Sequence, residues 1–129
     1  MKLITAILVT CMFAIVLTVV ATTQDNWAAP ARASAKKNPV AADATSIARG
    51  KTVYTAQCFT CHGASGRGDG PQAPQLEQNP GNLTKLQGQS DGALFWKVTQ
   101  GKTPMPTFAQ LLSEQQRWDV VNYIQTLSK

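Results

Sequence analysis

The chain of 129 residues contains only one histidine and three cysteines. A single histidine excludes any metal site that needs two imidazole ligands. The sequence also lacks an alternating apolar and polar run of useful length and lacks any internal repeat, which excludes sheet-based and repeat architectures. Groups that could bind a metal are therefore few, and the helical spacing of apolar residues elsewhere predicts an all-α fold.

Charge of either sign is scarce. Charged residues make up 15% of the chain, and 12 basic against 7 acidic residues give a formal net charge of +5. From residue 43 onward, 8 basic and 6 acidic residues leave only +2. So small an excess says little about the partner and leaves open a basic ring that steers acidic proteins. Nucleic-acid binding has no support once the cysteine and histidine motif described below is taken into account.

The longest apolar run lies at the N-terminus, where residues 3–20 carry no charge. At about 1.5 Å of rise per residue, a helix of this length just reaches the roughly 30 Å hydrocarbon core of a bilayer. Secretory signals have shorter apolar cores, of about 7 to 15 residues. Residues 1–23 are therefore predicted to be a membrane anchor or a signal sequence, with the anchor favoured, residues 3–22 in the membrane and Cys11 buried there.

The residues beside this run indicate its orientation. Lys2 precedes it and Asp25 follows it, so the positive-inside rule places the N-terminus in the cytoplasm. The rest of the chain would then lie on the periplasmic side of a bacterial inner membrane, or free in the periplasm if the chain is cleaved at a small-x-small site within residues 31–35. Trp27 would lie near the lipid headgroups.

Residues 24–42 are rich in alanine, proline and polar side chains and show no apolar period, so we expect a flexible linker. The globular domain is predicted to extend over residues 43–129. These 87 residues are few for a self-sufficient hydrophobic core. Something besides side chains is expected to complete that core.

Helix signals divide the domain into three helices. The first is expected to begin at Asp43 or Thr45, both good N-caps, and to continue toward Cys58. The second begins at residue 90 or 91 and ends at Gly101, which is a natural residue to follow a helix. Each of the two carries apolar residues spaced to form one buried face.

The third helix has the clearest start signal. Ser113 is its expected N-cap, Gln116 takes the reciprocal position of a capping box, and an apolar face then extends from Trp118 to Leu127.

Between the first and second helices, residues 63–84 are dominated by glycine, proline, asparagine and glutamine. A loop of that length inside a compact domain is expected to wrap around something.

Two cysteines and the histidine stand together in CFTCH, residues 58–62. A structural zinc site would need a fourth ligand besides Cys58, Cys61 and His62, and the domain offers no strong candidate. A dithiol redox motif belongs in a βαβ unit, which this sequence lacks. The spacing C-x-x-C-H is instead typical of covalent haem attachment, with both thiols bonded to the haem and the adjacent imidazole on the iron.

Apart from the initiator and one methionine in the apolar N-terminal run, Met105 is the only methionine. Pro104 and Pro106 flank it and keep this segment out of both neighbouring helices. A methionine that only fills core space would not need two prolines to fix its backbone. We therefore predict one covalently attached haem c whose iron has His62 and Met105 as axial ligands.

Residues 47–127 as a whole resemble the class I c-type cytochromes, in particular the small bacterial mono-haem domains. The matching segments are Gly50 with Tyr54, CFTCH at 58–62, GRGDGP at 66–71, NLT at 82–84, MPTF at 105–108 and WDVVNYIQTL at 118–127. The resemblance implies that the first and last helices cross, that the long loop covers an edge of the haem, and that Cys58, Cys61, His62 and Met105 hold it.

The resemblance also implies roles for residues around the haem. Gly50 would let the crossing helices approach closely, with Tyr54 packed against Val120 and Tyr123. The carbonyl of Pro71 or of Pro74 would accept the Nδ1 proton of the ligand histidine. Further candidates for contact with the haem or its propionates are Trp96, Trp118, Tyr123 and Arg67, although the core is the favoured environment of the three aromatic residues and solvent that of Arg67.

An iron with both axial positions taken is poorly suited to oxygen or peroxide chemistry and well suited to carrying single electrons. The sequence therefore predicts an electron carrier, not an enzyme, that exchanges electrons with redox protein donors and acceptors. Two alternatives stay open. One is a fixed subunit of a membrane respiratory oxidoreductase complex, and the other is a gas sensor or peroxidase in which Met105 dissociates.

Overall fold

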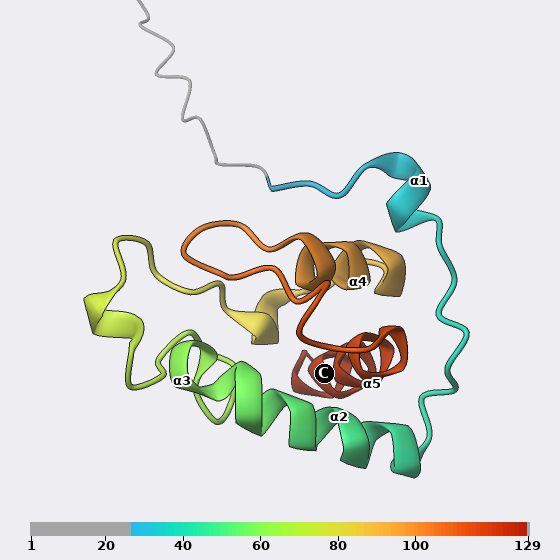
Figure 1. Ribbon diagram of the computed structural model, residues 1–129, viewed down its shortest axis with the longest axis horizontal. Helices are drawn as coiled ribbons and strands as arrows, with labels where there is room; N and C mark the ends of the chain where they lie inside the picture. The colour runs from blue at the N-terminus through green and yellow to red at the C-terminus, as the bar shows by residue number, and fades with distance from the viewer. Residues whose placement is uncertain (1–26, 129) are drawn as a thin grey trace, which may run out of the picture.

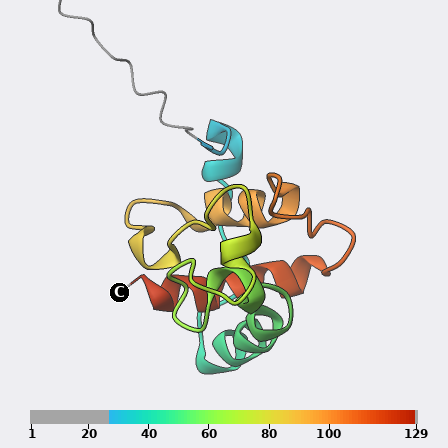
Figure 2. The same cartoon turned by 90° about the vertical axis from the view of Figure 1, so that its left-hand side faces the viewer.

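The computed structural model describes residues 27–128, and these are predominantly helical. The elements in chain order are α1 (Ala31–Ser34), α2 (Ala44–Gln57), α3 (Phe59–His62), the 3-10 helices η1 (Ala73–Gln75) and η2 (Leu83–Lys85), α4 (Asp91–Gln100) and α5 (Glu114–Leu127). In Figure 1, α5 lies between α2 on one side and α4 on the other, and Figure 2 shows α5 crossing α2. The predicted all-α fold is confirmed for this part of the chain.

The three expected helices are α2, α4 and α5, and side-chain caps mark each start. The Asp43 carboxylate accepts a hydrogen bond from the backbone N–H of Ser46 at 2.8 Å. The Ser90 hydroxyl accepts from Ala93 at 3.2 Å, and Ser113 forms the complete capping box with Gln116. Local sequence signals therefore determine where these helices begin, because each cap satisfies a backbone donor that the helix itself cannot.

The crossing of α2 and α5 depends on a glycine. A Cβ added to Gly50 would lie 2.0 Å from the backbone oxygen of Asp119 and 2.9 Å from the Cβ of Tyr123. One helical turn further along α2, the Tyr54 ring packs on the Tyr123 ring with 5.1 Å between centroids. The expected close approach at Gly50 is thus confirmed, since no larger residue fits between the two helices.

We expect Gly50→Ala to destabilise the protein by about 1 to 2 kcal/mol. Overpacking a close contact costs roughly 1 to 3 kcal/mol, whereas alanine gains only about 1 kcal/mol of helix propensity over glycine. The strain should outweigh the gain in helix propensity, because the new methyl group would meet the α5 backbone, which cannot rotate away as a side chain can. Urea unfolding of the variant, with Thr52→Ala on the exposed face of α2 as control, measures the loss. Unchanged stability of Gly50→Ala would show that the helices separate freely.

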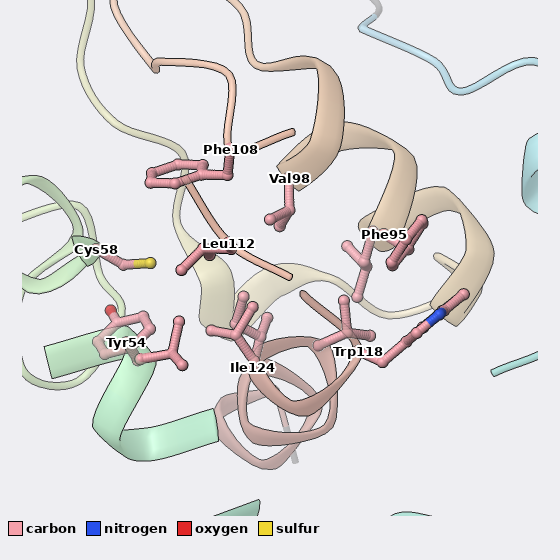
Figure 3. Close-up of a cluster of buried hydrophobic side chains, with 12 residues drawn as sticks. Tyr54, Cys58, Phe95, Val98, Phe108, Leu112, Trp118 and Ile124 are labelled. Atoms are coloured by element: carbon pink, nitrogen blue, oxygen red, sulfur yellow. The ribbon is translucent and has the colours of Figure 1, made fainter. Parts of the chain in front are cut away.

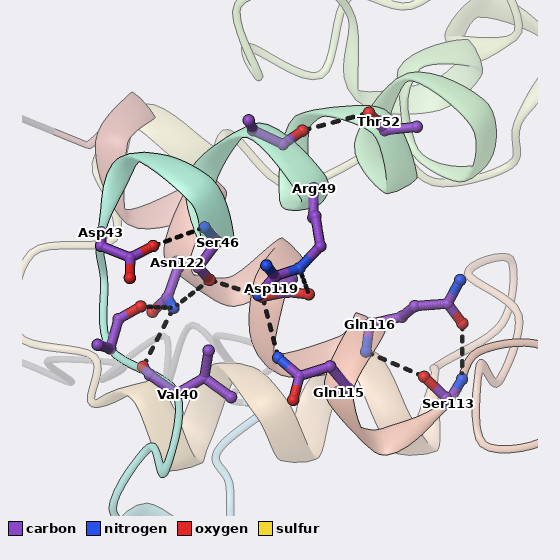
Figure 4. Close-up of polar contacts among 12 residues, drawn as sticks. Val40, Asp43, Ser46, Arg49, Thr52, Ser113, Gln115, Gln116, Asp119 and Asn122 are labelled. Carbon is purple, nitrogen blue, oxygen red and sulfur yellow. Dashed lines mark hydrogen bonds and ion pairs between the residues drawn. The ribbon is translucent and has the colours of Figure 1, made fainter.

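A buried polar cluster ties α2 to α5 at the same crossing (Figure 4). The Asp119 side chain is 2% exposed and accepts bonds from Arg49 Nε and Nη2, each at 2.8 Å. The Ser46 hydroxyl donates to it at 2.6 Å and in turn accepts from Asn122 at 2.8 Å. Burial alone would raise the pKa of the Asp119 carboxyl, but the bonds from Arg49, Ser46 and Gln115 outweigh it and lower that pKa.

Asp119→Asn should therefore lower stability at neutral pH and change its acid dependence. A depressed folded-state pKa means that the carboxylate stabilises the fold fully above its unfolded pKa of about 3.9 and loses this contribution as the pH falls through the folded value. Breaking a buried pair costs roughly 3 to 5 kcal/mol, and we expect about 2 kcal/mol because Arg49 is 48% exposed and can turn to water. Between pH 7 and the acid transition, the urea midpoint should change less with pH in the variant than in the wild-type protein. The exposed control Glu77→Gln should keep the wild-type profile.

Residues 27–42, here called the N-terminal strap, pack along α4 and α5. The Ser90 hydroxyl donates to the backbone oxygen of Ser34 at 2.6 Å. Asn38 donates from Nδ2 to Oδ1 of Asn122 at 2.7 Å, and Val40 packs against the core. Figure 1 shows this segment descending from α1 to the start of α2. The sequence predicts a flexible linker here, and the structure differs from it. Polar side chains and backbone groups hold the strap in place, and such contacts do not require an apolar period in the sequence.

The predicted anchor over residues 3–22, and the first residues of the expected linker, lie outside the described residues. Within residues 27–128, no helix has both the length and the apolar character needed to cross a membrane.

Candidate functional site

The C-x-x-C-H motif lies where α2 gives way to α3. Cys58 is at once the C-cap of α2 and the N-cap of α3, and its N–H donates to the carbonyl of Tyr54 at 2.8 Å. The N–H of His62 then donates to the carbonyl of Cys58 at 2.9 Å. Residues three and four apart on one helical turn share a face, so Cys58, Cys61 and His62 project together, as the sequence predicts.

These three residues open onto an apolar cavity. Its volume is about 390 Å³, and its lining includes Cys58, Cys61, His62 and Met105. All four predicted site residues therefore meet at one cavity although 47 positions separate the first from the last. In Figure 3, Cys58 points its sulfur into the cluster that surrounds it. Apolar side chains make up much of the remaining wall, among them Leu83, Leu94, Val98, Phe108, Leu112 and Ile124.

The cavity and its sulfur groups fit a covalently bound haem. Cys58 and Cys61 are free thiols, and burial raises the pKa of Cys58 to about 12. A dithiol redox centre needs a thiolate of low pKa, so this environment does not suit one. Among residues 27–128, no three histidine, cysteine or acidic side chains gather to hold a metal ion. The site therefore suits a large apolar ring bonded to both thiols better than it suits a zinc ion or a redox-active dithiol.

The imidazole of His62 is held in the tautomer that a metal ligand needs. Its Nδ1 lies 3.0 Å from the backbone oxygen of Gly81, and because a carbonyl can only accept, Nδ1 carries the proton. Burial lowers the pKa of His62, while the bond to Gly81 opposes that shift. The neutral ring therefore keeps its lone pair on Nε2, and the donated bond makes this nitrogen a stronger electron donor.

The expected acceptor for His62 was the carbonyl of Pro71 or Pro74, and this expectation is wrong. The loop of residues 63–84 first returns along α3, where Gln72 N–H donates to the carbonyl of Thr60 at 2.8 Å, and both prolines are exposed there. It then turns back so that Leu83 N–H donates to the Gly66 carbonyl at 2.6 Å. This second pass carries Gly81, and not a proline carbonyl, to the imidazole.

A second bond fixes the backbone that follows His62. The buried Tyr54 hydroxyl donates to the carbonyl of Gly63 at 2.7 Å. Burial also raises the pKa of Tyr54, so this hydroxyl stays protonated and able to donate. Tyr54 thus has two functions, since it packs at the helix crossing and anchors the residue next to the predicted ligand.

Met105 reaches the cavity from a tight turn. Its N–H donates to the Lys102 carbonyl at 2.8 Å, and Lys102 N–H donates back to the Met105 carbonyl at 3.0 Å. After the turn, the Thr107 hydroxyl donates to the Thr99 carbonyl at 2.6 Å, which holds the segment to the end of α4. The side chain is half-buried. As the flanking prolines predict, Met105 lies outside every helix.

The aromatic candidates for contact with the haem do not line the cavity. Trp118 is 1% exposed and stacks on Phe95 with 3.8 Å between ring centroids. The cavity wall includes none of Trp96, Trp118, Tyr123 and Arg67, but it includes Trp27 and Lys97. The sequence does signal Lys97, because its spacing from Leu94 and Val98 places it on the same face of α4. Its position after the apolar run predicts the lipid headgroups for Trp27, whereas the structure places this residue at the cavity wall.

Comparisons with known proteins identify the family of this chain. The family model described as cytochrome c matches residues 47–128. Cytochrome c6 of Alaria esculenta is 32% identical over 82 residues, which cover 64% of this chain and 92% of the relative. Subunit CcoP of the cbb3-type cytochrome c oxidase of Azospirillum is 34% identical over 97 residues, which cover 70% of this chain and 31% of the relative.

Among solved structures, a chain of the reducing HAO-like protein complex of Kuenenia stuttgartiensis is 34% identical with a TM-score of 0.66. The match covers 70% of this chain and 47% of that one. The chain therefore spans less than half of the CcoP subunit and of this complex component, whereas it spans nearly all of cytochrome c6.

Proposed function

The chain belongs to the cytochrome c family, which carries one covalently bound haem c, and we propose that it transfers single electrons with the iron held between His62 and Met105. The observation that carries this proposal is an apolar cavity that the C-x-x-C-H residues and Met105 line together. When bound, the haem supplies an iron that accepts and releases one electron. Cys58 and Cys61 would bond to it covalently.

The chain's own residues would bind the haem and keep water out of its cavity. The bond from Nδ1 of His62 to Gly81 orients the ring and leaves Nε2 to bind the metal. The turn at Met105 supplies a thioether, which raises the reduction potential compared with a second nitrogen ligand. Buried side chains such as Val98 and Phe108, 6% and 3% exposed, exclude water from the cavity. With His62 and Met105 both holding the iron, no position would remain for a substrate, which favours electron transfer over catalysis.

The test is the pigment of the purified full-length protein. We expect a visible spectrum that changes reversibly with reductant and oxidant, a mass increase of one haem, and colour that stays with the polypeptide in acidified acetone. Pigment that washes out in acetone, or a polypeptide without added mass, would overturn the assignment.

A second candidate, the fixed subunit of a membrane oxidoreductase, is favoured by the packed strap. If residues 3–22 cross the membrane, only residues 23–26 lie between the span and Trp27. At about 3.5 Å per extended residue, they reach roughly 14 Å. A domain so close to the periplasmic face of the membrane has little room to move between distant partners, which suits a subunit better than a shuttle. The similarity to CcoP agrees with this role.

Purification in a mild detergent distinguishes the two roles. A fixed subunit should copurify with other redox proteins in constant stoichiometry, whereas a free carrier should elute as a monomer. The visible spectrum of membranes before and after a salt wash also shows whether the protein is anchored.

A further inference from the structure

The N-terminal strap contributes to the cavity wall. Of the residues that line the cavity, Trp27 alone comes from outside residues 47–128, the range that the family model matches. The strap, which precedes the residues that the family model matches, therefore supplies one part of the cavity wall.

Two neighbours on α4 hold the indole of Trp27. Its ring centroid lies 6.4 Å from that of Trp96, and the rings are tilted by 54°. The Lys97 ammonium lies 5.4 Å from the Trp27 ring centroid and donates to Gln89 Oε1 at 2.6 Å. Lys97 also lines the cavity. A cation over an indole face is attractive, so Trp27 has a defined position at the cavity even though it is only half-buried.

The strap itself is held at several points away from Trp27. A Cβ on Gly92 would lie 2.2 Å from the backbone oxygen of Ala33 and 2.5 Å from that of Lys36, so the strap rests directly on the start of α4. The Lys36 ammonium pairs with Glu114 at 3.0 Å and lies 4.6 Å from the Phe95 ring centroid. These contacts hold the strap in place independently of the indole.

We propose that Trp27 is a wall of the haem cavity supplied by the strap, a positioning residue that excludes water from the haem and so raises its reduction potential. The inference rests on the proposed function. Water near the haem stabilises the oxidised state, which carries one more positive charge, and the dryness of the surrounding shell therefore sets the potential. The part of the chain that precedes the family domain would then tune the redox centre.

Trp27→Ala in the full-length holoprotein tests this proposal. We expect a lower reduction potential, seen as a several-fold smaller ratio of reduced to oxidised protein at the wild-type midpoint. The shift of the Soret band in ethylene glycol, which reports solvent access to the haem, should increase. Trp27→Phe should restore most of both values. Leu111→Ala, a similar loss of apolar surface at a residue 63% exposed and away from the cavity, should change neither.

Gly92→Ala tests the strap without altering Trp27. Alanine favours the helix over glycine by about 1 kcal/mol, so α4 should form, but the methyl group would displace the strap from Ala33 and Lys36. We expect faster tryptic cleavage after Arg32, Lys36 and Lys37, together with the same lower potential and larger Soret shift as in Trp27→Ala.

Unchanged potential and Soret shift in Trp27→Ala, with the strap still resistant to trypsin, would overturn the proposal. A protein without covalent haem would instead overturn the proposed function, and the role of Trp27 with it. Trypsin resistance does not depend on the pigment, so it would still show whether the strap packs on α4.

Discussion

Replacing Cys58 and Cys61 together by serine should leave the domain without a stable fold. Serine cannot form the thioether bonds, so the cavity of about 390 Å³ would have no covalently held occupant. An apolar cavity that loses its occupant destabilises the fold around it, and a typical domain has only about 5 to 15 kcal/mol of stability to lose. We therefore expect the fold to depend on the bound haem.

Far-UV circular dichroism and thermal unfolding of the full-length double variant measure this effect. We expect a large loss of helical signal and no cooperative transition. Cys11→Ser, which removes the cysteine outside the domain, should retain both the pigment and the transition. A double variant that unfolds cooperatively without pigment would show that the side chains alone sustain the core.

The features that the sequence predicts well are those specified by neighbouring residues. The first residues of α2, α4 and α5 follow from N-caps such as Asp43 and Ser113, whose partners lie three residues away. The clustering of Cys58, Cys61 and His62 follows in the same way, because one helical turn brings them to one face. Met105 is distant in sequence, but it is the only methionine of residues 43–129, and the structure places it at the cavity.

The features that the sequence does not predict depend on contacts between distant segments. Gly81 meets His62 because Leu83 pairs with Gly66, and a run of glycine, proline and polar residues carries no signal for that pairing. The strap rests on Gly92 through the backbone oxygens of residues 33 and 36. Backbone groups are the same at every residue, so a contact made through them leaves no pattern in the strap's own sequence.

Helix α4 connects these two sets of features. Leu94 and Val98 line the cavity, while Gly92 and Trp96 receive the strap. Lys97 contributes to both, since it lines the cavity and lies over the Trp27 ring. A displacement of the strap therefore has a direct physical route to the haem cavity through a single rigid element.

Arg117 of α5 stabilises the segment that follows Met105. Its Nη1 donates to the carbonyls of Ala109 at 2.9 Å and Leu112 at 3.1 Å. The guanidinium carbon lies 5.3 Å from the Phe95 ring centroid. The position of the methionine segment thus depends on α5 as well as on α4, so the same helix that crosses α2 also supports the second predicted ligand.

Met105→Leu should cause the largest change in the redox properties of the protein. Leucine has nearly the volume of methionine, so stability should fall by less than about 1.5 kcal/mol, but the sulfur donor is lost. Axial ligands set haem potentials over a range of roughly 0.8 V, and methionine lies on the high side of it. We expect a substantial fall in the reduction potential and the loss of the weak red absorption band that a sulfur bond to oxidised iron produces.

Ile124→Leu provides the matched control, because it alters the cavity wall without touching a sulfur and should leave the band and nearly all of the potential. The reduced variant at Met105 should also bind carbon monoxide, whereas the wild-type protein at neutral pH should not, since its sixth position is taken. Binding by the wild-type protein would instead support the sensor or peroxidase alternative, in which Met105 dissociates. An oxidised spectrum that Met105→Leu leaves unaltered would show that another group is the ligand, and because the domain has no second histidine or methionine, the search would then turn to the cavity-lining Lys97 and Lys102.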